Sequence, residues 1–217
     1  MSPTAVPLPT FPSLAEASAL VEQLREKATA SGLKLWSLAG KTLIPVVQGG
    51  MGVGISAGGL AGTVARMGAV GTISSVDLRR LHPDLMEKTR PLEKSRDVAH
   101  AKGVIDAANN EALRREIARA REISQGLGLI AVNVMKAISA YAQNVRTALE
   151  AGIDAVVVGA GLPLDLPELA KDHPKAALIP ILSDARGVQL IVKKWEKKGR
   201  LPDAIVIEHP RLAGGHL

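Results

Sequence analysis

The stretch PVVQGGMGVGISAGGLAG, residues 45–62, places a short apolar run directly before a cluster of glycines, and the cluster leads into a helix-like pattern. The apolar run is typical of a buried strand, and the glycines are typical of a turn with little room for side chains. Gly52, Gly54 and Ala57 form a G-x-G-x-x-A pattern, a weak indication of dinucleotide binding. A tight turn without a ligand is also compatible with it. The stretch predicts a strand, a glycine turn and a helix.

Further apolar, β-type runs follow along the chain, and all but the last precede a helix-length segment. Together with the first, the runs cover residues 43–48, 70–74, 129–134, 155–158, 177–182 and 204–207. Because the runs are continuous and do not alternate with polar residues, we expect both faces of each strand to be buried, as in parallel sheets covered by helices. The sequence therefore predicts the α/β class.

Helical patterns occupy most of the remaining chain. Residues 13–31 predict a leader helix, because Ser13 and Glu16 fit a capping box and Gly32 can end the helix. The stretch 76–110 is rich in charge and interrupts the alternation, so we interpret it as an excursion from the C-terminal end of a strand. The expected buried faces of two further helices are marked by Leu60, Val64 and Met67, and by Leu113, Ile117 and Ala120.

Composition excludes several classes of function. The net charge is +6 and the sequence pI about 9.7, but two Trp, one Tyr and one Phe provide little base stacking, so we expect no nucleic-acid partner. The basic run at 193–200 is interpreted as a solvated helix face. There is no cysteine, which excludes disulfides and thiol catalysis, and no His, Asp or Glu set has metal-ligand spacing. No signal peptide or membrane segment is expected, which favours the cytoplasm.

Small and polar residues recur where the predicted strands end. Asn133, Gly159, Ser183 and Glu208 occupy such positions, and the last strand is followed by AGGH at 213–216. In a (β/α)8 TIM barrel all strand ends converge on one face, whereas a dinucleotide-binding fold needs mainly its first turn to be special. The distribution favours the barrel, with a small-molecule substrate bound at this face.

The ordered set PVVQGGMGVGIS, GAVGTISS, IAVNVM, VVVGAGLPLDLP, IPILSD and AGGH resembles the nitronate monooxygenase family, formerly called 2-nitropropane dioxygenase, and its flavin-dependent enoyl-reductase relatives. The resemblance covers about residues 40–217 and implies an FMN-dependent TIM barrel. We therefore divide the chain into an N-terminal leader and helix, 1–39, and a barrel domain, 40–217, with an insertion near 76–110.

The resemblance also implies an FMN site. The backbone of the glycine turn would lie against the isoalloxazine ring, Asn133 would hydrogen-bond the flavin, and Ser183 would lie near the ring or the ribityl chain. Glu208 would stand near the ribityl chain, and the last two glycines would bind the phosphate. The full set is Gly49, Gly50, Met51, Gly52, Asn133, Gly159, Ser183, Glu208, Gly214 and Gly215.

Relatives that oxidise nitronates use a histidine near the end of the fourth strand, where this chain has Gly159, Ala160 and Gly161. His216 is therefore the candidate catalytic residue, because it follows the glycines expected to bind phosphate. Surface roles are expected for the histidines of the excursion and of a helix end, His82, His100 and His173. His209 stands where relatives have a small residue.

About six of the eight strands of a TIM barrel are apparent, so we expect a barrel that is incomplete at its C-terminal end. An open barrel exposes strand edges, which favours a truncated chain, a partner or self-association. The functional hypotheses are an FMN-dependent oxidoreductase acting on alkyl nitronates with O₂, a flavin-dependent enoyl reductase, a non-catalytic partial barrel and an NAD(P)-binding Rossmann-type protein.

Overall fold

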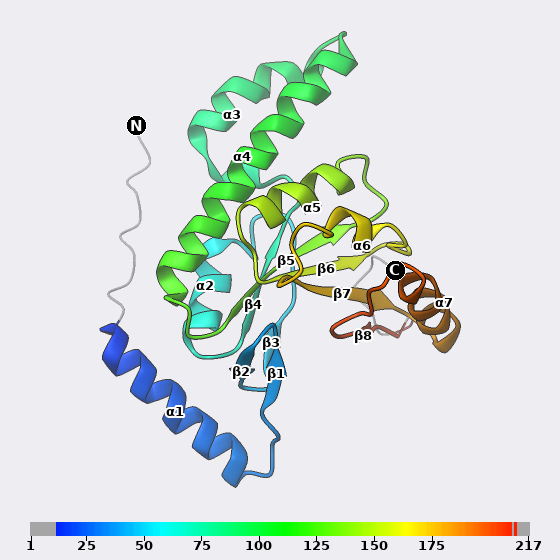
Figure 1. Ribbon diagram of the computed structural model, residues 1–217. Coiled ribbons are helices and arrows are strands. Elements are labelled where there is room, and N and C mark those ends of the chain that lie inside the picture. Colours follow the sequence, from blue (N-terminus) through cyan, green and yellow to red (C-terminus); the bar gives the residue numbers. More distant parts are fainter. Residues whose placement is uncertain (1–11, 210, 212–217) are drawn as a thin grey trace.

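The computed structural model of the chain describes residues 12–209 and 211 (Figure 1). Within them lies a six-stranded parallel sheet whose strand order follows the sequence, β3-β4-β5-β6-β7-β8. The strands are β3 Val47–Gln48, β4 Val70–Ser74, β5 Leu129–Met135, β6 Ala155–Gly159, β7 Ala177–Leu182 and β8 Val206–Ile207. All six predicted strands are present, although the first is shortened to β3.

This strand order decides between the two α/β folds. A doubly wound dinucleotide-binding sheet has the strand order 3-2-1-4-5-6, so its fourth strand lies beside the first and a crevice opens at this switch point. Here each strand is hydrogen-bonded to the strand that precedes it in the chain, without reversal. The sheet is an incomplete TIM barrel, and the Rossmann-type alternative is wrong.

The two faces of the sheet carry separate apolar cores. Side chains at one set of alternate positions, such as Ile130 and Val132, pack with the helices in the larger core. Those at the other set, such as Leu129 and Ala131, form a smaller core on the concave side. Strands buried on both faces are thus the physical reason why the apolar runs were continuous.

A short antiparallel hairpin covers the smaller core, and the sequence did not predict it. It consists of β1 Trp36–Leu38 and β2 Lys41–Leu43, joined by Ala39 and Gly40, both of which have positive φ. The ammonium of Lys41 donates to Gly128 O at 2.6 Å, just before β5 begins. The hairpin therefore lies at the amino ends of the strands and closes that end of the sheet.

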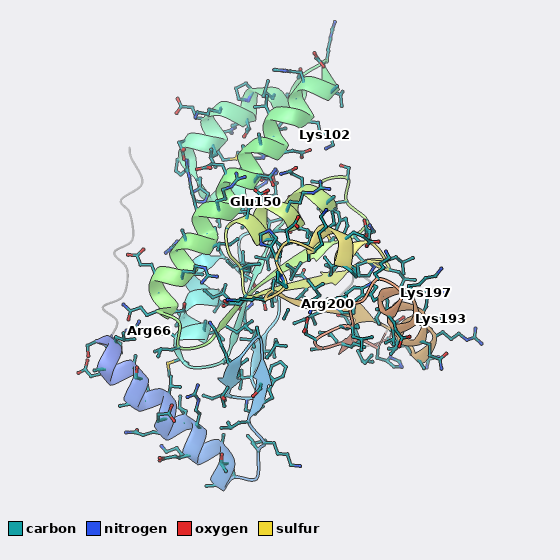
Figure 2. All side chains as sticks on the ribbon, viewed as in Figure 1. Arg66, Lys102, Glu150, Lys193, Lys197 and Arg200 are labelled. Carbon is teal, nitrogen blue, oxygen red and sulfur yellow. The ribbon has the colours of Figure 1, made fainter. Side chains whose placement is uncertain are left out.

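The helices are α1 Leu14–Ala30, α2 Gly58–Arg66, α3 Pro83–Thr89, α4 Val98–Ser124, α5 Tyr141–Glu150, α6 Leu166–Leu169 and α7 Ala185–Glu196. The predicted leader helix is confirmed as α1, including the capping box in which Ser13 and Glu16 each bond the other's backbone. Trp195 on α7 is fully buried, whereas Lys193 on α7 and Lys197, directly after it, project away from the fold (Figure 2). Lys193, Lys194 and Lys197 of the basic run are exposed, as interpreted from the sequence, whereas Lys198 and Arg200 are paired with Glu168 and Asp203.

The buried face of α2 differs from the prediction. Leu60 and Met67 are 43% and 36% exposed, and the residues that face inward are small. A Cβ on Gly62 would lie 2.9 Å from the backbone of Ala120 on α4. Because α2 and α4 meet backbone to backbone, only small residues fit between them, and the larger apolar side chains turn outward.

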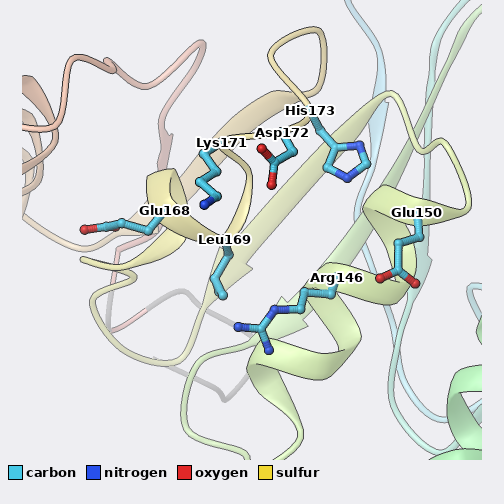
Figure 3. A pocket seen from close by; sticks show the side chains of 7 residues that line it. All are labelled: Arg146, Glu150, Glu168, Leu169, Lys171, Asp172 and His173. Atoms are coloured by element: carbon cyan, nitrogen blue, oxygen red, sulfur yellow. The ribbon is translucent and has the colours of Figure 1, made fainter.

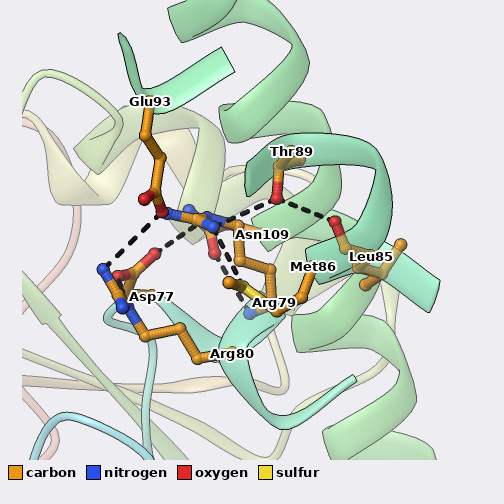
Figure 4. Close-up of polar contacts among 8 residues, drawn as sticks. All are labelled: Asp77, Arg79, Arg80, Leu85, Met86, Thr89, Glu93 and Asn109. Carbon is orange, nitrogen blue, oxygen red and sulfur yellow. Dashed lines mark hydrogen bonds and ion pairs between the residues drawn. The ribbon is translucent and has the colours of Figure 1, made fainter. Parts of the chain in front are cut away.

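The excursion after β4 is an ordered helical unit that contains two 3₁₀ helices, Leu78–Leu81 and Arg90–Lys94, with α3 between them. Together with the amino-terminal half of α4, α3 projects beyond the sheet (Figure 1). The guanidinium of Arg79, which is 4% exposed, holds the unit together. It lies 3.0 Å from carboxylate oxygens of Asp77 and Glu93 and donates to Thr89 Oγ1 (Figure 4).

Candidate active site

The carboxyl ends of the strands, where the glycine turn crosses the sheet, form the candidate site. The chain leaves β3 at Gln48, whose side chain stays on the neighbouring strand. Gln48 Nε2 donates to Thr72 O at 3.1 Å, and Gln48 Oε1 accepts from Thr72 N at 3.0 Å. The carboxamide thus bonds both backbone groups of Thr72, the residue of β4 that follows its last pair with β3.

The hydroxyl of Ser56 links two backbone groups of the glycine turn. Its side chain is buried, and its hydroxyl accepts from Met51 N at 2.9 Å and donates to Gly49 O at 3.2 Å. The hydroxyl also accepts from the side-chain amide of Gln48 at 3.0 Å. Neither Gln48 nor Ser56 was predicted from the sequence, although a polar residue at each end of a glycine cluster indicates that the turn has side-chain hydrogen bonds.

The glycine turn lies against the end of β5. A Cβ on Gly50 would lie 2.5 Å from Asn133 Cβ, so a side chain is excluded there, while a Cβ on Gly49 would meet nothing within 4 Å. Asn133 is half-buried, and its carboxamide has no hydrogen-bond partner among the described residues. Bare, open backbone beside a free amide fits a flat heteroaromatic ring with polar edges, such as a flavin.

The other predicted ligands lie at neighbouring strand ends. Gly159 is buried at the end of β6, where a Cβ would lie 3.0 Å from Ile181 Cδ1, so a larger residue would have to displace the end of that side chain. Ser183 is exposed after β7, and Glu208 is half-buried after β8. The expected phosphate ligands Gly214 and Gly215 and the expected catalytic His216 lie outside the described residues.

The loop between β6 and α6 is held from the end of β5. Lys136 Nζ lies 2.7 and 2.9 Å from the two carboxylate oxygens of Asp165 and 4.0 Å from the centre of the Tyr141 ring. Within the loop, Ala160 has φ +55° and Gly161 has φ +126°. A left-handed alanine is strained, so the ion pair fixes an unfavourable loop conformation beside the site.

Burial and nearby charges shift the pKa values of Asp165 and Tyr141, which form a cluster with Lys136. Burial raises the pKa of the Asp165 carboxyl, but the hydrogen bond from Lys136 and its charge outweigh burial, so the pKa lies below its ordinary value. Burial, followed by the charge of Asp165, raises the pKa of the Tyr141 hydroxyl well above its ordinary value. At neutral pH the cluster therefore contains an anionic Asp165 and a neutral Tyr141.

The histidines of the excursion differ from one another. His100 is exposed, as expected. The prediction of a surface role for His82 is wrong, because its Nε2 lies 3.1 Å from Glu116 Oε1, and the two side chains are 17% and 3% exposed. His173 is half-buried in a cavity of about 430 Å³ (Figure 3).

That cavity lies on the outside of the barrel, between α5 and the segment that contains α6. Its lining is Arg146, Glu150, Glu168, Leu169, Lys171, Asp172 and His173 (Figure 3). Glu150 and Glu168 are paired with Arg114 and Lys198, respectively. The lining contains none of the predicted strand-end residues, so the cavity is separate from the candidate site.

Residues 12–209 and 211 contain no group of three or more His, Cys, Asp or Glu side chains placed to hold a metal ion. None of their helices combines the length and the apolar character that crossing a membrane requires.

The chain is similar to several known proteins. The structure resembles FabK from Thermotoga maritima, with a TM-score of 0.51 and 19% identity over 75% of this chain. Nitroalkane oxidase from Streptomyces ansochromogenes matches 76% of this chain at 14% identity, with a TM-score of 0.31. The chain spans 40% of the length of the FabK chain and 64% of the nitroalkane oxidase chain.

FabK shows likeness of fold alone at this identity, and it supports the partial barrel described above. No curated protein matches the sequence. A family model does match: that of nitronate monooxygenase covers residues 34–217, which is most of the chain. This chain therefore belongs to the nitronate monooxygenase family.

Proposed function

We propose that this chain is the flavin-binding part of an FMN-dependent oxidoreductase that oxidises alkyl nitronates with O₂. Family membership supports oxidoreductase chemistry with a flavin. The observation that carries the proposal is the open backbone at Gly49, next to the contact of Gly50 with Asn133, whose carboxamide has no partner among the described residues. FMN, when bound, supplies the redox chemistry, and the protein supplies binding and orientation.

Each residue of the site then has a distinct task. The backbone of the glycine turn lies along one face of the ring, and Ser56 keeps that backbone in place through its bonds to Met51 N and Gly49 O. Asn133 bonds a polar edge of the ring with its free carboxamide. Ser183 and Glu208 bind the ribityl chain, and Gly214 and Gly215 bind the phosphate through backbone N–H groups.

The proton acceptor for a nitronate substrate is proposed to be His216. A second candidate reaction, reduction of an enoyl thioester by hydride from the flavin, needs no base near the end of β6. It is favoured by the glycines at 159 and 161, where nitronate-oxidising relatives have a histidine. Comparing turnover of the two substrate classes by the FMN-loaded protein distinguishes the reactions. A cytoplasmic location is part of the same proposal.

Cofactor binding tests the proposal most directly. We expect the purified chain to show flavin absorbance, or to gain it with added FMN in stoichiometric amount. Gly49→Val should abolish binding without unfolding the protein, because the new side chain enters open space that the ring would fill. The matched control is Gly103→Ala on α4, which also meets nothing within 4 Å but lies far along the chain from the turn.

Failure of the wild-type chain to bind FMN would overturn the proposal for this chain. Binding by both wild type and Gly49→Val would mean that the ring lies elsewhere.

We also propose that copies of the chain associate through the open edges of the sheet. Val46 and Val47 at one edge are 54% and 55% exposed, and Ile207 at the other is 61% exposed. Unpaired strand edges with apolar side chains favour strand pairing between chains. Sedimentation should give a mass above that of one chain, and Val47→Lys with Ile207→Lys should return it to the monomer. A monomeric wild type would refute self-association and leave the flavin proposal intact.

A further inference from the structure

Glu116 is a buried carboxylate that the proposed chemistry does not use. It lies in the middle of α4, and the residue is 2% exposed. Glu116 Oε2 accepts from Gly58 N at 2.7 Å, and Glu116 Oε1 lies 3.1 Å from His82 Nε2. Burying a charged carboxylate is costly unless its oxygens are paired. Here Oε2 accepts a hydrogen bond, and Oε1 lies at ion-pair distance from His82 Nε2, a buried atom that makes no hydrogen bond within the described part of the chain.

The first partner is the end of the glycine turn. Gly58 is the first residue of α2, and the preceding Ala57 gives the helix no side-chain cap. Glu116 supplies that cap from a position 58 residues farther along the chain. A carboxylate at a helix N-terminus is also favoured by the helix dipole. A Cβ on Gly58 would lie 2.4 Å from Glu116 O, so the turn ends in direct contact with α4.

The second partner belongs to the excursion. His82 is the residue that precedes α3, and its side chain is 17% exposed, although Nε2 itself is buried. Histidine is the side chain whose charge ordinarily changes between about pH 5 and 8. The pair is an ion pair only when His82 is protonated. Three segments, the glycine turn, α4 and the excursion, therefore meet at one carboxylate.

Other charged groups around the pair are already engaged or point elsewhere. Arg115 on α4 is bound to Asp84 on α3 at 3.0 Å, and Arg119 lies beside Gly59, 3.6 Å from the place of a Cβ. In the first 3₁₀ helix of the excursion, Arg79 and Arg80 are paired with Asp77 and Glu93. Among the described histidines, His82 is the one within ion-pair distance of Glu116.

We propose that Glu116 is a positioning residue for the glycine turn, and that the protonation state of His82 sets how firmly it holds the amide of Gly58. Protonated His82 stabilises the carboxylate that caps α2, so the turn is held more firmly at low pH than at high pH. The excursion is thereby coupled to the candidate flavin site. The link to flavin rests on the function proposed above, but the pH dependence of the hydrogen bond between Glu116 and Gly58 N does not.

Amide hydrogen exchange of the whole chain, followed residue by residue by NMR without flavin, tests the strength of this hydrogen bond. The protection factor of the Gly58 amide should be about two- to fivefold greater near pH 6 than near pH 8, as expected for a charge at a helix terminus. His82→Gln should remove this pH dependence. The control is the amide of Gly187 on α7, capped locally by Asp184 at 2.7 Å, whose protection should not respond to His82.

Glu116→Gln provides a second test, because it keeps an acceptor for Gly58 N but removes the charge. We expect lower Gly58 protection and no pH dependence in this variant. If Glu116→Gln does not fold, His82→Gln still decides. Equal pH dependence of Gly58 protection in wild type and His82→Gln would overturn the inference.

FMN titration then tests the coupling. His82→Gln should bind FMN with a pH dependence weaker than that of wild type by the same two- to fivefold factor. If the wild type binds no FMN but the exchange result holds, the proposed function fails and the positioning role of Glu116 stands. Unchanged FMN binding in His82→Gln, with altered exchange, would refute the coupling to the flavin.

Discussion

The carboxamide of Gln48 hydrogen-bonds both backbone groups of Thr72, donating to its carbonyl and accepting from its amide. A side chain thereby continues the pairing of β3 with β4 after the main chain has turned away. The glycine turn can leave the sheet early because no backbone group of Thr72 is left without a partner. The position of the candidate site thus depends on one polar side chain at the end of a two-residue strand.

Replacing Gln48 by Glu should lower the free energy of unfolding by about 1–3 kcal/mol, because the carboxylate cannot donate to Thr72 O and leaves it unpaired. Urea unfolding followed by circular dichroism measures the change. Gln143→Glu on the exposed side of α5 is the control and should cost little, since Gln143 bonds only Thr147 within its own helix. Equal stability of Gln48→Glu and wild type would contradict the pairing.

Gly62→Ala should destabilise the protein by about 1–3 kcal/mol, because its Cβ would lie 2.8 Å from Ile123 Cβ and 2.9 Å from the Ala120 backbone. The neighbouring Gly59→Ala meets only the Arg119 guanidinium at 3.6 Å and should be neutral or stabilising by up to about 1 kcal/mol. The two variants differ only in the face of α2 that they alter. Similar melting temperatures for both would mean that α2 and α4 are not in close contact.

Ala160→Gly should raise stability modestly, by up to about 1 kcal/mol, because glycine adopts the left-handed conformation without strain. Gly161→Ala should have the opposite sign, since φ is +126° there. Thermal unfolding of the pair gives both signs in one experiment. A loss of stability in Ala160→Gly would show that the loop conformation is not strained.

The pH dependence of stability should report the pairing of Lys136 with Asp165. The folded state lowers the pKa of Asp165, so its contribution is present above the ordinary Asp pKa of about 3.9 and is lost as pH falls through the lower folded value. Lys136→Met should be less stable than wild type at neutral pH, and the difference should shrink below about pH 4. Because Asp165 is 48% exposed, solvent screening keeps the effect small. A difference that is constant with pH would indicate lost packing alone.

The strands and the barrel could be predicted because parallel strands buried on both faces leave continuous apolar runs. The hairpin could not, since its strands have three residues each and its turn uses Ala39 in place of the usual Asn or Asp. From the sequence, the large apolar residues of α2 were expected to be buried. In the structure, α4 approaches α2 so closely that only small residues fit between them. Helical periodicity alone does not indicate how closely a neighbouring backbone approaches.

Part of the site was also accessible from sequence. The glycine turn and Asn133 were singled out as strand-end residues, and the structure brings them into contact at Gly50. Glu116 and His82 were not connected, because the contacts that define their roles join segments far apart in the chain. The ionic partner of a histidine depends on tertiary structure, so a lone His in a polar stretch gave no signal.

The strand order is also the order of synthesis. Each strand of the sheet pairs with the strand made just before it, so a strand leaving the ribosome finds its partner already translated. No early strand must wait for a distant later one, and the longest interval, between β4 and β5, is occupied by helices that fold locally. The sheet can therefore grow from one edge during translation, and β3 is the first of its strands to be made.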